Sequence, residues 1–282
     1  MTTIPNIKKY MRSLPIWRVD TEGGILCEDY LAAEEPLEIL IGFGSASKRQ
    51  RQTIAVTMRT PEQDVDLAIG FLFTEGVISD KKDVINARFL SENKLLIDLN
   101  ESLSFDIDRL NRHFYTTSSC GVCGKSSIEA VSTTSCFLLN PDKPIVSKNV
   151  LFELTQKLRA AQSVFDSTGG IHASGLFDTE GTLLKVCEDV GRHNALDKLI
   201  GWALQKELLP LKNHILLVSG RVSFELIQKA MMAGIPILAA VGAPSSLAVE
   251  LADDNNMTLV GFLRDGRFNV YVGAQRITGF NP

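Results

Sequence analysis

The clearest indication of the fold is the run Ile215-Leu216-Leu217-Val218-Ser219-Gly220-Arg221-Val222-Ser223-Phe224-Glu225. Its apolar first part has the length and composition of a buried strand. Ser219 or Ser223 can then cap a helix that starts directly after the turn. Strand-like and helix-like segments alternate in this way through the second half of the chain. That alternation predicts an α/β layer with a partly parallel sheet.

The other elements of this half follow the same pattern. We predict strands over residues 173–177, 183–188, 215–219, 237–241 and 258–262, and helices over residues 148–162, 194–206, 223–233 and 247–253. In an open α/β sheet, ligands bind where strands end and helices begin. The turns of this half are therefore the expected positions of a binding site.

The first half of the chain has a different pattern. Residues 36–41 and 53–58 are strand-like, and residues 83–100 return to strands. Between them, Thr60-Pro61-Glu62-Gln63 has the proline and the acids of a helix start, and an apolar face continues to Gly76. This half therefore indicates a small α+β unit with a helix packed on a sheet.

These patterns divide the chain into four parts. We predict a flexible leader over residues 1–14 and the small α+β domain over residues 15–110. A connector over residues 111–147 follows, and a second α/β domain occupies residues 148–282. The chain is long enough to bury a sizeable core in such an arrangement.

The composition is that of a globular protein without strong charge. The chain has 282 residues and a formal net charge of −4, so it has no general attraction for nucleic acid or anionic membranes. No apolar run approaches the length of a transmembrane helix, and residues 1–13 lack the apolar core of a signal peptide. The five cysteines do not suggest a secreted disulfide framework. We therefore expect a protein of the reducing cytoplasm.

The strongest chemical signal is a pair of cysteines in Ser118-Ser119-Cys120-Gly121-Val122-Cys123-Gly124-Lys125. The thiolate is the reactive form of cysteine, and a helix N-terminus or a nearby cation favours it. Residues 126–131 can start such a helix, and Lys125 supplies a cation. The glycines leave both sulfurs accessible to a partner. Catalytic or carrier sulfur chemistry at Cys120 and Cys123 is therefore the leading interpretation.

Metal binding and a structural or redox pair remain alternatives. A structural zinc site takes four ligands, often from two such pairs, whereas Cys27, Cys136 and Cys187 are scattered singly. These three fit small buried hydrophobic residues. A thioredoxin-like motif would follow a strand, whereas residues 111–119 have the composition of a polar loop.

Polar turns of the second half contain the candidate binding residues. His172 follows two glycines, Arg192, His193 and Asn194 open a predicted helix, and Arg221 follows an apolar strand. Helix N-termini bind anions, and a guanidinium can donate two hydrogen bonds to phosphate. Two further turns, residues 242–246 and 262–267, follow strands in the same way. Together these turns suggest a large polyanionic ligand with hydrogen-bonding ring systems.

Each turn also has a structural explanation. The glycines before His172 can simply end the preceding helix, and His172 fits a structural histidine. Ser245 and Ser246 fit helix caps. Asp197 and Lys198 fit surface or ion-pair residues. Residues 262–267, with two arginines and an aromatic side chain, fit an ordinary hairpin as well as a phosphate or guanine site.

Four motifs, in this order along the chain, resemble those of the FdhD family. They are Cys120-Gly-Val-Cys123-Gly-Lys125, Gly170-Ile-His172-Ala, Glu188-Asp-Val-Gly-Arg192-His193-Asn194-Ala and Ser219-Gly-Arg221-Val-Ser223-Phe-Glu225. The resemblance covers nearly the whole chain. It implies an accessory sulfurtransferase that formate dehydrogenase needs for activity.

The resemblance further implies a route for the sulfur. A cysteine desulfurase would supply it, the protein would hold it as a persulfide, and the molybdenum bis(molybdopterin guanine dinucleotide) cofactor would receive it before insertion into the formate dehydrogenase apoenzyme. The partners implied are thus the desulfurase and the dehydrogenase, with no nucleic acid and no membrane. Because the cofactor has two-fold character, a homodimer with paired sites is expected.

Matched residue by residue, the resemblance makes Cys120 the persulfide cysteine and Cys123 its partner. The implied cofactor-binding residues are Phe262, Leu263, Arg264, Asp265, Gly266 and Arg267, together with His172, Arg192, His193, Asn194, Ser219 and Arg221. The second domain would have a cytidine deaminase-like fold. Those deaminases hold zinc with His-x-Glu and a later cysteine pair, whereas His172-Ala173-Ser174 lacks the glutamate and no later pair exists. No zinc is therefore expected.

Two other functions are alternatives to sulfur transfer. A binding chaperone would shield the cofactor without transferring sulfur, and its cysteines would be structural or redox-sensing. A metal-binding regulator would instead carry near-stoichiometric metal.

Overall fold

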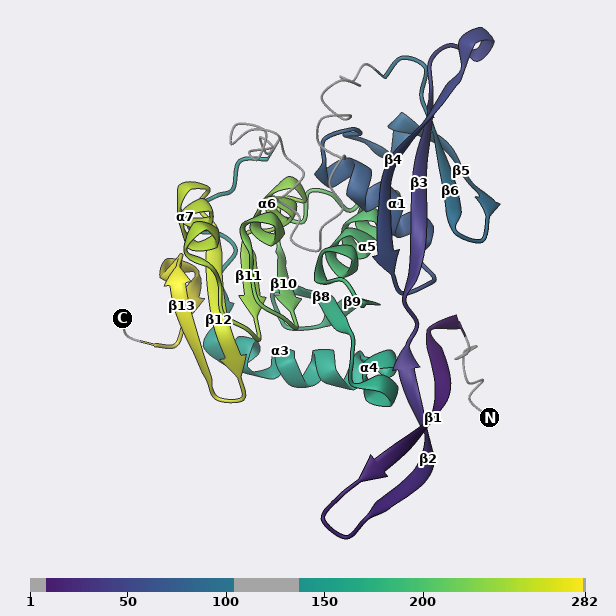
Figure 1. Ribbon diagram of the computed structural model, residues 1–282. Helices are drawn as coiled ribbons and strands as arrows, with labels where there is room; N and C mark the ends of the chain where they lie inside the picture. The colour runs from purple at the N-terminus through teal and green to yellow at the C-terminus, as the bar shows by residue number, and fades with distance from the viewer. Residues whose placement is uncertain (1–8, 104–136, 281–282) are drawn as a thin grey trace.

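The computed structural model describes residues 9–103 and 137–280, which form two main β-sheets with helices packed on them and two further two-stranded sheets (Figure 1). The larger sheet has six strands from the second half of the chain, and the smaller sheet has four strands from the first half. This mixed architecture confirms the predicted α/β class. The likeness to the cytidine deaminase fold stays a prediction.

The larger sheet has the strand order β13-β12-β11-β10-β8-β9. Its strands are β8 (His172–Asp178), β9 (Leu183–Asp189), β10 (His214–Val218), β11 (Ile237–Ala240), β12 (Thr258–Arg264) and β13 (Arg267–Val272). β10 pairs with β11, and β11 with β12, in parallel, while the other neighbours are antiparallel. The sheet is therefore partly parallel, as the alternation predicts.

Helices cover both faces of this sheet. They are α3 (Lys148–Ala161), α4 (Ser163–Thr168), α5 (Arg192–Gln205), α6 (Phe224–Met232) and α7 (Ser246–Asp254). On one face, Leu154 and Leu158 of α3 pack with Ile215 and Leu217 of β10. On the other face, Leu216 of the same strand packs with side chains of α5, α6 and α7. The alternation along β10 therefore assigns successive residues to opposite faces.

The smaller sheet has the order β4-β3-β6-β5. It contains β3 (Glu35–Phe43), β4 (Gln50–Arg59), β5 (Val84–Ser91) and β6 (Lys94–Leu99), and α1 (Asp64–Thr74) packs on it. Helix α1 begins directly after the predicted start signal. Short elements elsewhere are β7 (Val146–Ser147), β14 (Ile277–Thr278) and 3-10 turns at Ala46–Lys48, Lys81–Asp83 and Ala274–Arg276.

The two sheets are joined by a close crossing of α1 and α5. Gly70 and Gly201 lie where the helix backbones meet, and a Cβ added to Gly70 would overlap the carbonyl oxygen of Asp197. One apolar cluster consequently extends from Leu37 and Ile39 of β3 through these helices to β10. The predicted domain boundaries stay predictions, and most of the connector, residues 104–136, lies outside the described residues.

A hairpin of β1 (Met11–Val19) and β2 (Gly24–Ala32) projects beyond α4 at one end of the molecule (Figure 1). Its base is held by Met11, which clusters with Val164 of α4 and with Ile171. Strand structure thus begins at Met11, inside the stretch predicted as a flexible leader, because pairing with β2 and burial extend to that residue. Within the described ranges, no helix is both long and apolar enough to cross a membrane.

Candidate functional site

The turns predicted to bind a ligand meet at one edge of the larger sheet. The parallel strands β10, β11 and β12 all end there, and β8, which runs the opposite way, begins there at His172. Ser219 and Val241, which directly follow two of these strands, therefore lie near His172. This is the edge at which α/β sheets bind ligands.

A pocket of about 660 Å³ opens at this edge. Five predicted site residues line it, namely His172, Ser219, Leu263, Arg264 and Asp265. The opposite wall consists of side chains from α3 and α4, together with the Gly169-Gly170 turn. The strand order thus brings together turns that are far apart in the sequence.

Ser219 and His172 are tightly placed on the sheet side of the pocket. The Ser219 amide donates to the Ala173 carbonyl at 2.9 Å, and the Ala173 amide donates to Ser219 Oγ at 2.8 Å. A Cβ on Gly220 would lie 3.3 Å from His172 Nδ1, so glycine allows the close approach of the imidazole. Burial first, and the charge of Arg192 second, lower the pKa of His172 below its ordinary 6.5.

The turn between β12 and β13 forms the rim of the pocket. Arg264 Nη1 donates to the carbonyl of Val241 at 2.7 Å, which ties the turn to the end of β11. Both carboxylate oxygens of Asp265 accept hydrogen bonds from α3, from Thr155 Oγ1 at 3.2 Å and from Gln156 Nε2 at 2.9 Å. Asp265, predicted as a cofactor contact, therefore joins the turn to α3.

A second, smaller pocket of about 340 Å³ lies on the other side of the same turn. Phe262, Arg264, Arg267 and Asn269 line it, so Arg264 faces both pockets. Phe262 has a positive φ of 53° beside an irregularity in the pairing of β12 with β13, an unusual conformation for a bulky residue. The predicted segment from Phe262 to Arg267 is thus the hairpin connection between β12 and β13, and its residues also line the two pockets.

The predicted residues His193 and Arg192 at the start of α5, and Arg221 after β10, lie in three different environments. His193 Nε2 lies 3.2 Å from Ser223 Oγ and 3.0 Å from Glu225 Oε2, so it links the starts of α5 and α6. Arg192 Nε is buried without a hydrogen-bond partner among the described residues. Arg221 is exposed and lines neither pocket.

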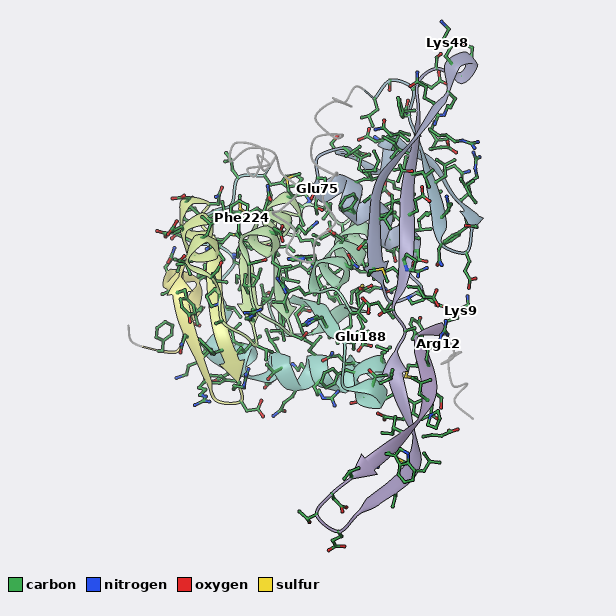
Figure 2. All side chains as sticks on the ribbon, in the orientation of Figure 1. Lys9, Arg12, Lys48, Glu75, Glu188 and Phe224 are labelled. Atoms are coloured by element: carbon green, nitrogen blue, oxygen red, sulfur yellow. The ribbon has the colours of Figure 1, made fainter. Side chains whose placement is uncertain are left out.

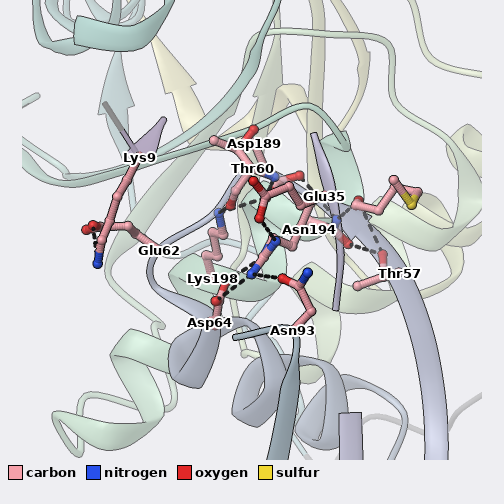
Figure 3. Close-up of polar contacts among 12 residues, drawn as sticks. Lys9, Glu35, Thr57, Thr60, Glu62, Asp64, Asn93, Asp189, Asn194 and Lys198 are labelled. Atoms are coloured by element: carbon pink, nitrogen blue, oxygen red, sulfur yellow. Dashed lines mark hydrogen bonds and ion pairs between the residues drawn. The ribbon is translucent and has the colours of Figure 1, made fainter. Parts of the chain in front are cut away.

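Asn194 instead faces the smaller sheet. Its Nδ2 donates to the carbonyl of Met58 at 2.8 Å and to Asp189 Oδ1 at 3.1 Å, and its Oδ1 accepts from Thr57 Oγ1 at 3.2 Å. Figure 3 shows this contact between β4 and the start of α5. Asn194 therefore connects the two halves of the fold, and it does not line the pocket.

A buried ion pair strengthens the same connection. Lys198 Nζ lies 2.7 Å from Asp189 Oδ2 and donates to the carbonyl of Thr60 at 2.8 Å, while the Thr60 amide donates to Asp189 Oδ2 at 3.1 Å (Figure 3). Asp197 forms a second buried pair with Lys229 at 2.8 Å. The ion-pair alternative for Asp197 and Lys198 is thus confirmed, and a surface position for them is wrong.

Sequence patterns did not indicate the pocket wall formed by α3 and α4. Thr155, Gln156 and Arg159 lie on the polar side of an ordinary amphipathic helix, and nothing in their spacing marks a site. The guanidinium of Arg159 lies 4.3 Å from the ring centre of Phe165, so the wall combines a cation with an aromatic face. Only the packing of α3 against the sheet brings them to the pocket.

Cys120 and Cys123 lie outside the described residues. Among the residues that are described, no cluster of three or more His, Cys, Asp or Glu side chains could hold a metal ion. Cys187 is buried, as predicted, and burial raises the pKa of its thiol to about 12. Cys27 is only half-buried, so the prediction of a buried position is wrong for it, because it lies on the β1–β2 hairpin, and Cys136 lies outside the described residues.

Comparison with known proteins identifies the family. The model of the FdhD/NarQ family matches residues 32–278. The sulfur carrier protein FdhD of Mycolicibacterium paratuberculosis is 52% identical over 256 residues, which cover 88% of this chain and 91% of the relative. The protein of the same name from Sulfurisphaera tokodaii is 39% identical over 267 residues, covering 95% of this chain and 99% of the relative.

A solved structure has the same overall fold. A crystal structure described as a formate dehydrogenase accessory protein from Desulfotalea psychrophila superposes with a TM-score of 0.75 over 95% of this chain and 100% of that chain. At 21% identity this likeness speaks for the fold alone. The family model and the relatives, which match the chain almost end to end, confirm the resemblance of the four motifs: the chain belongs to the FdhD/NarQ family.

Proposed function

We propose that this protein is a sulfur carrier for formate dehydrogenase. It accepts sulfur from a cysteine desulfurase as a persulfide on Cys120 and passes it to the molybdenum bis(molybdopterin guanine dinucleotide) cofactor before the cofactor enters the apoenzyme. The observation that carries the proposal is the 52% identity over 88% of the chain to a protein named sulfur carrier protein FdhD. The presence of the Cys-x-x-Cys motif supports it from the chemical side.

The acceptance step is a thiol exchange. The Cys120 thiolate attacks the outer sulfur of the desulfurase persulfide, the sulfur–sulfur bond of the donor breaks, and the desulfurase cysteine leaves as a thiolate. Release of the carried sulfur as sulfide requires two electrons. Cys123 supplies them by attacking the Cys120 sulfur, which forms a Cys120–Cys123 disulfide that a cellular thiol must then reduce.

The pocket beside His172 is the proposed binding site for one guanine nucleotide group of the cofactor. Its volume of about 660 Å³ suits a group of that size. Arg159 and Arg264 line it and can offset phosphate charge, and the ring of Phe165 offers a face for a base. The buried Nε of Arg192, which has no hydrogen-bond partner in the described part of the chain, is a further donor near His172. These donors fit an anionic ligand with ring systems.

The direct test is mass spectrometry after incubation with a cysteine desulfurase and cysteine. We expect the mass of one added sulfur atom on the peptide that contains Cys120, and its loss in the Cys120→Ala variant. Cys27→Ala is the matched control because Cys27 is partly exposed but lies on β2. Sulfur that appears on Cys27 or nowhere would contradict the proposal.

A cofactor-binding chaperone without sulfur transfer is the second candidate. The observation that favours it is the pocket itself, which offers arginine and histidine side chains to a ligand and needs no thiol to hold it. In cells lacking the native copy, Cys120→Ala should abolish formate dehydrogenase activity if the protein carries sulfur. GDP binding, used as a probe of the pocket, should persist. Retention of both properties would favour the chaperone, and stoichiometric zinc by elemental analysis would favour a metal-binding regulator.

Cytoplasmic location and a homodimer with paired sites complete the proposal. The thiol chemistry requires a reducing compartment. The two-fold character of the cofactor favours two-fold symmetry in its carrier.

A further inference from the structure

Helix α4, Ser163–Thr168, forms part of the pocket wall but has little stability of its own. It has six residues, and an isolated helix of that length is unstable in water. The chain leaves the helical conformation at both ends. Gln162 before it has a ψ of 87°, and Gly169 after it is left-handed, with a φ of 66°. Contacts from outside the helix must therefore determine where it lies.

The side chain of Glu188 supplies one such contact. Glu188 belongs to β9, and it lies between the end of that strand and α4 (Figure 2). Its Oε2 accepts a hydrogen bond from the Val164 amide at 3.1 Å, and its Oε1 accepts one from the Phe165 amide at 3.0 Å. The carboxylate therefore satisfies two of the amides that a helix leaves unpaired at its start.

This arrangement replaces an ordinary helix cap. The residue at the N-cap position of α4 is Gln162, and its side chain makes no capping hydrogen bond. Glu188, from the neighbouring strand, takes over that role with a charged acceptor. Burial raises the pKa of Glu188, and the hydrogen bonds from the two amides oppose that rise. The bonds to α4 thus offset part of the cost of burying the carboxylate.

The effect of this contact extends to the pocket, although Glu188 does not line it. The pocket wall contains Phe165 of α4 and the Gly169-Gly170 turn that follows the helix. The Phe165 ring centre lies 4.3 Å from the Arg159 guanidinium, and Arg159 also forms an ion pair with Asp166 of α4 at 2.5 Å. A shift of α4 would therefore move the aromatic face and the cation of the wall together.

An apolar contact also holds α4. Val164 clusters with Met11 and Ile171, and the partly buried ring of Phe165 packs against the same cluster. Apolar burial has no preferred direction, whereas hydrogen bonds to two successive amides restrict both the position and the rotation of a helix. The orientation of the Phe165 ring therefore depends on Glu188.

From these contacts we infer that Glu188 is a positioning residue for the ligand of the pocket. It sets the orientation of α4 and, through α4, that of the Phe165 ring on which a planar group of the ligand stacks. The inference rests on the nucleotide site proposed above and adds a residue that lies outside it. It also gives a role to the first residue of its motif, in which Asp189 and Asn194 connect the two halves of the fold.

GDP binding to the full chain, measured by isothermal titration calorimetry, tests this role. In Glu188→Gln the side chain keeps its size, but the charge is lost and an NH2 group faces one of the helix amides. We expect the dissociation constant for GDP to rise about tenfold. Glu180→Gln is the matched control, because Glu180 lies in the turn before β9, where it accepts a hydrogen bond from Thr179. It should bind GDP like the wild type.

A double-mutant cycle shows whether Glu188 acts through the ring. Phe165→Leu should itself weaken GDP binding about tenfold, because it removes the stacking face. Without that face, adding Glu188→Gln should raise the dissociation constant by less than about threefold. Hydrogen exchange gives a second readout. The peptide over residues 162–170 should exchange faster in Glu188→Gln, while urea unfolding of the whole chain stays cooperative.

The inference fails if Glu188→Gln binds GDP like the wild type, if its loss is the same in both backgrounds, or if Glu180→Gln loses as much. A Glu188→Gln protein without a cooperative urea transition would also overturn it, because the residue would then support the whole fold.

Sulfur loading of Cys120 by a desulfurase is measured on the same samples and reports on the carrier function separately. Normal loading together with unchanged GDP binding in Glu188→Gln would refute the positioning role alone. A wild type that loads sulfur but binds no GDP would refute the nucleotide site and the positioning role with it. A wild type that takes no sulfur would refute the carrier function.

Discussion

At the level of single residues, polar side chains in similar turns perform different tasks. His172, Ser219 and Arg264 line the pocket, whereas Asn194 and Lys198, from the equally polar first two turns of α5, bind β4 and the loop at Thr60. A buried charge is costly unless it is paired. Lys198 therefore forms an ion pair with Asp189 and donates a hydrogen bond to the carbonyl of Thr60. Residue type alone does not distinguish these tasks, because both require the same donors and acceptors.

The position of His172 leads to a pH prediction. Burial first, and Arg192 second, lower the pKa of this imidazole below 6.5. As the pH falls, His172 therefore takes up a proton at a higher pH in the unfolded chain than in the folded protein. Its contribution to stability is lost as pH falls below 6.5 toward the folded pKa. A proton NMR titration across roughly pH 4 to 8 should place its midpoint below 6.5.

The Arg192→Met variant should move that midpoint upward, because it removes the neighbouring positive charge. Arg51→Met, which alters an exposed arginine on β4, is the control and should leave the midpoint unchanged. The signal is assigned from the spectrum of His172→Gln. An Arg192→Met midpoint equal to that of the wild type would show that the two side chains do not interact as described.

At the level of elements, the crossing of α1 and α5 depends on glycine. Gly70→Ala should destabilise the protein by about 3 kcal/mol, because the new Cβ would overlap the carbonyl oxygen of Asp197 and the helices must separate. The free energy of unfolding in urea is the measurement. Gly170→Ala is the control, since its Cβ would meet nothing closer than the Thr168 oxygen at 3.8 Å. Equal effects of the two substitutions would contradict the close crossing.

At the level of the entire fold, the shared core predicts cooperative unfolding. One apolar cluster contains Leu37 of the smaller sheet, Leu67 of α1 and Leu216 of the larger sheet. In a Trp17→Phe variant, Trp202 on α5 is the remaining tryptophan of the two. Its fluorescence and the far-UV circular dichroism should follow a single urea transition. Two separate transitions would mean that the halves unfold independently.

Local patterns were sufficient for the elements themselves. The helix predicted over residues 148–162 is α3, Lys148–Ala161, and the start signal at residues 60–63 precedes α1 directly. The Cys120–Cys123 motif and three turn motifs were sufficient to indicate the family. Such features are encoded within a few residues, because periodicity, caps and turn residues act on the adjacent backbone.

Contacts between distant segments depended on the tertiary structure. The order of the strands, β13-β12-β11-β10-β8-β9, determines that His172 meets Arg264 across a pocket and that α3 supplies the opposite wall. Packing of α5 on α1 determines that Asn194 faces Met58, away from the pocket. The sequence by itself therefore determined the kinds of element and the chemistry available, whereas the fold decided which side chains meet, because long-range packing has no local pattern.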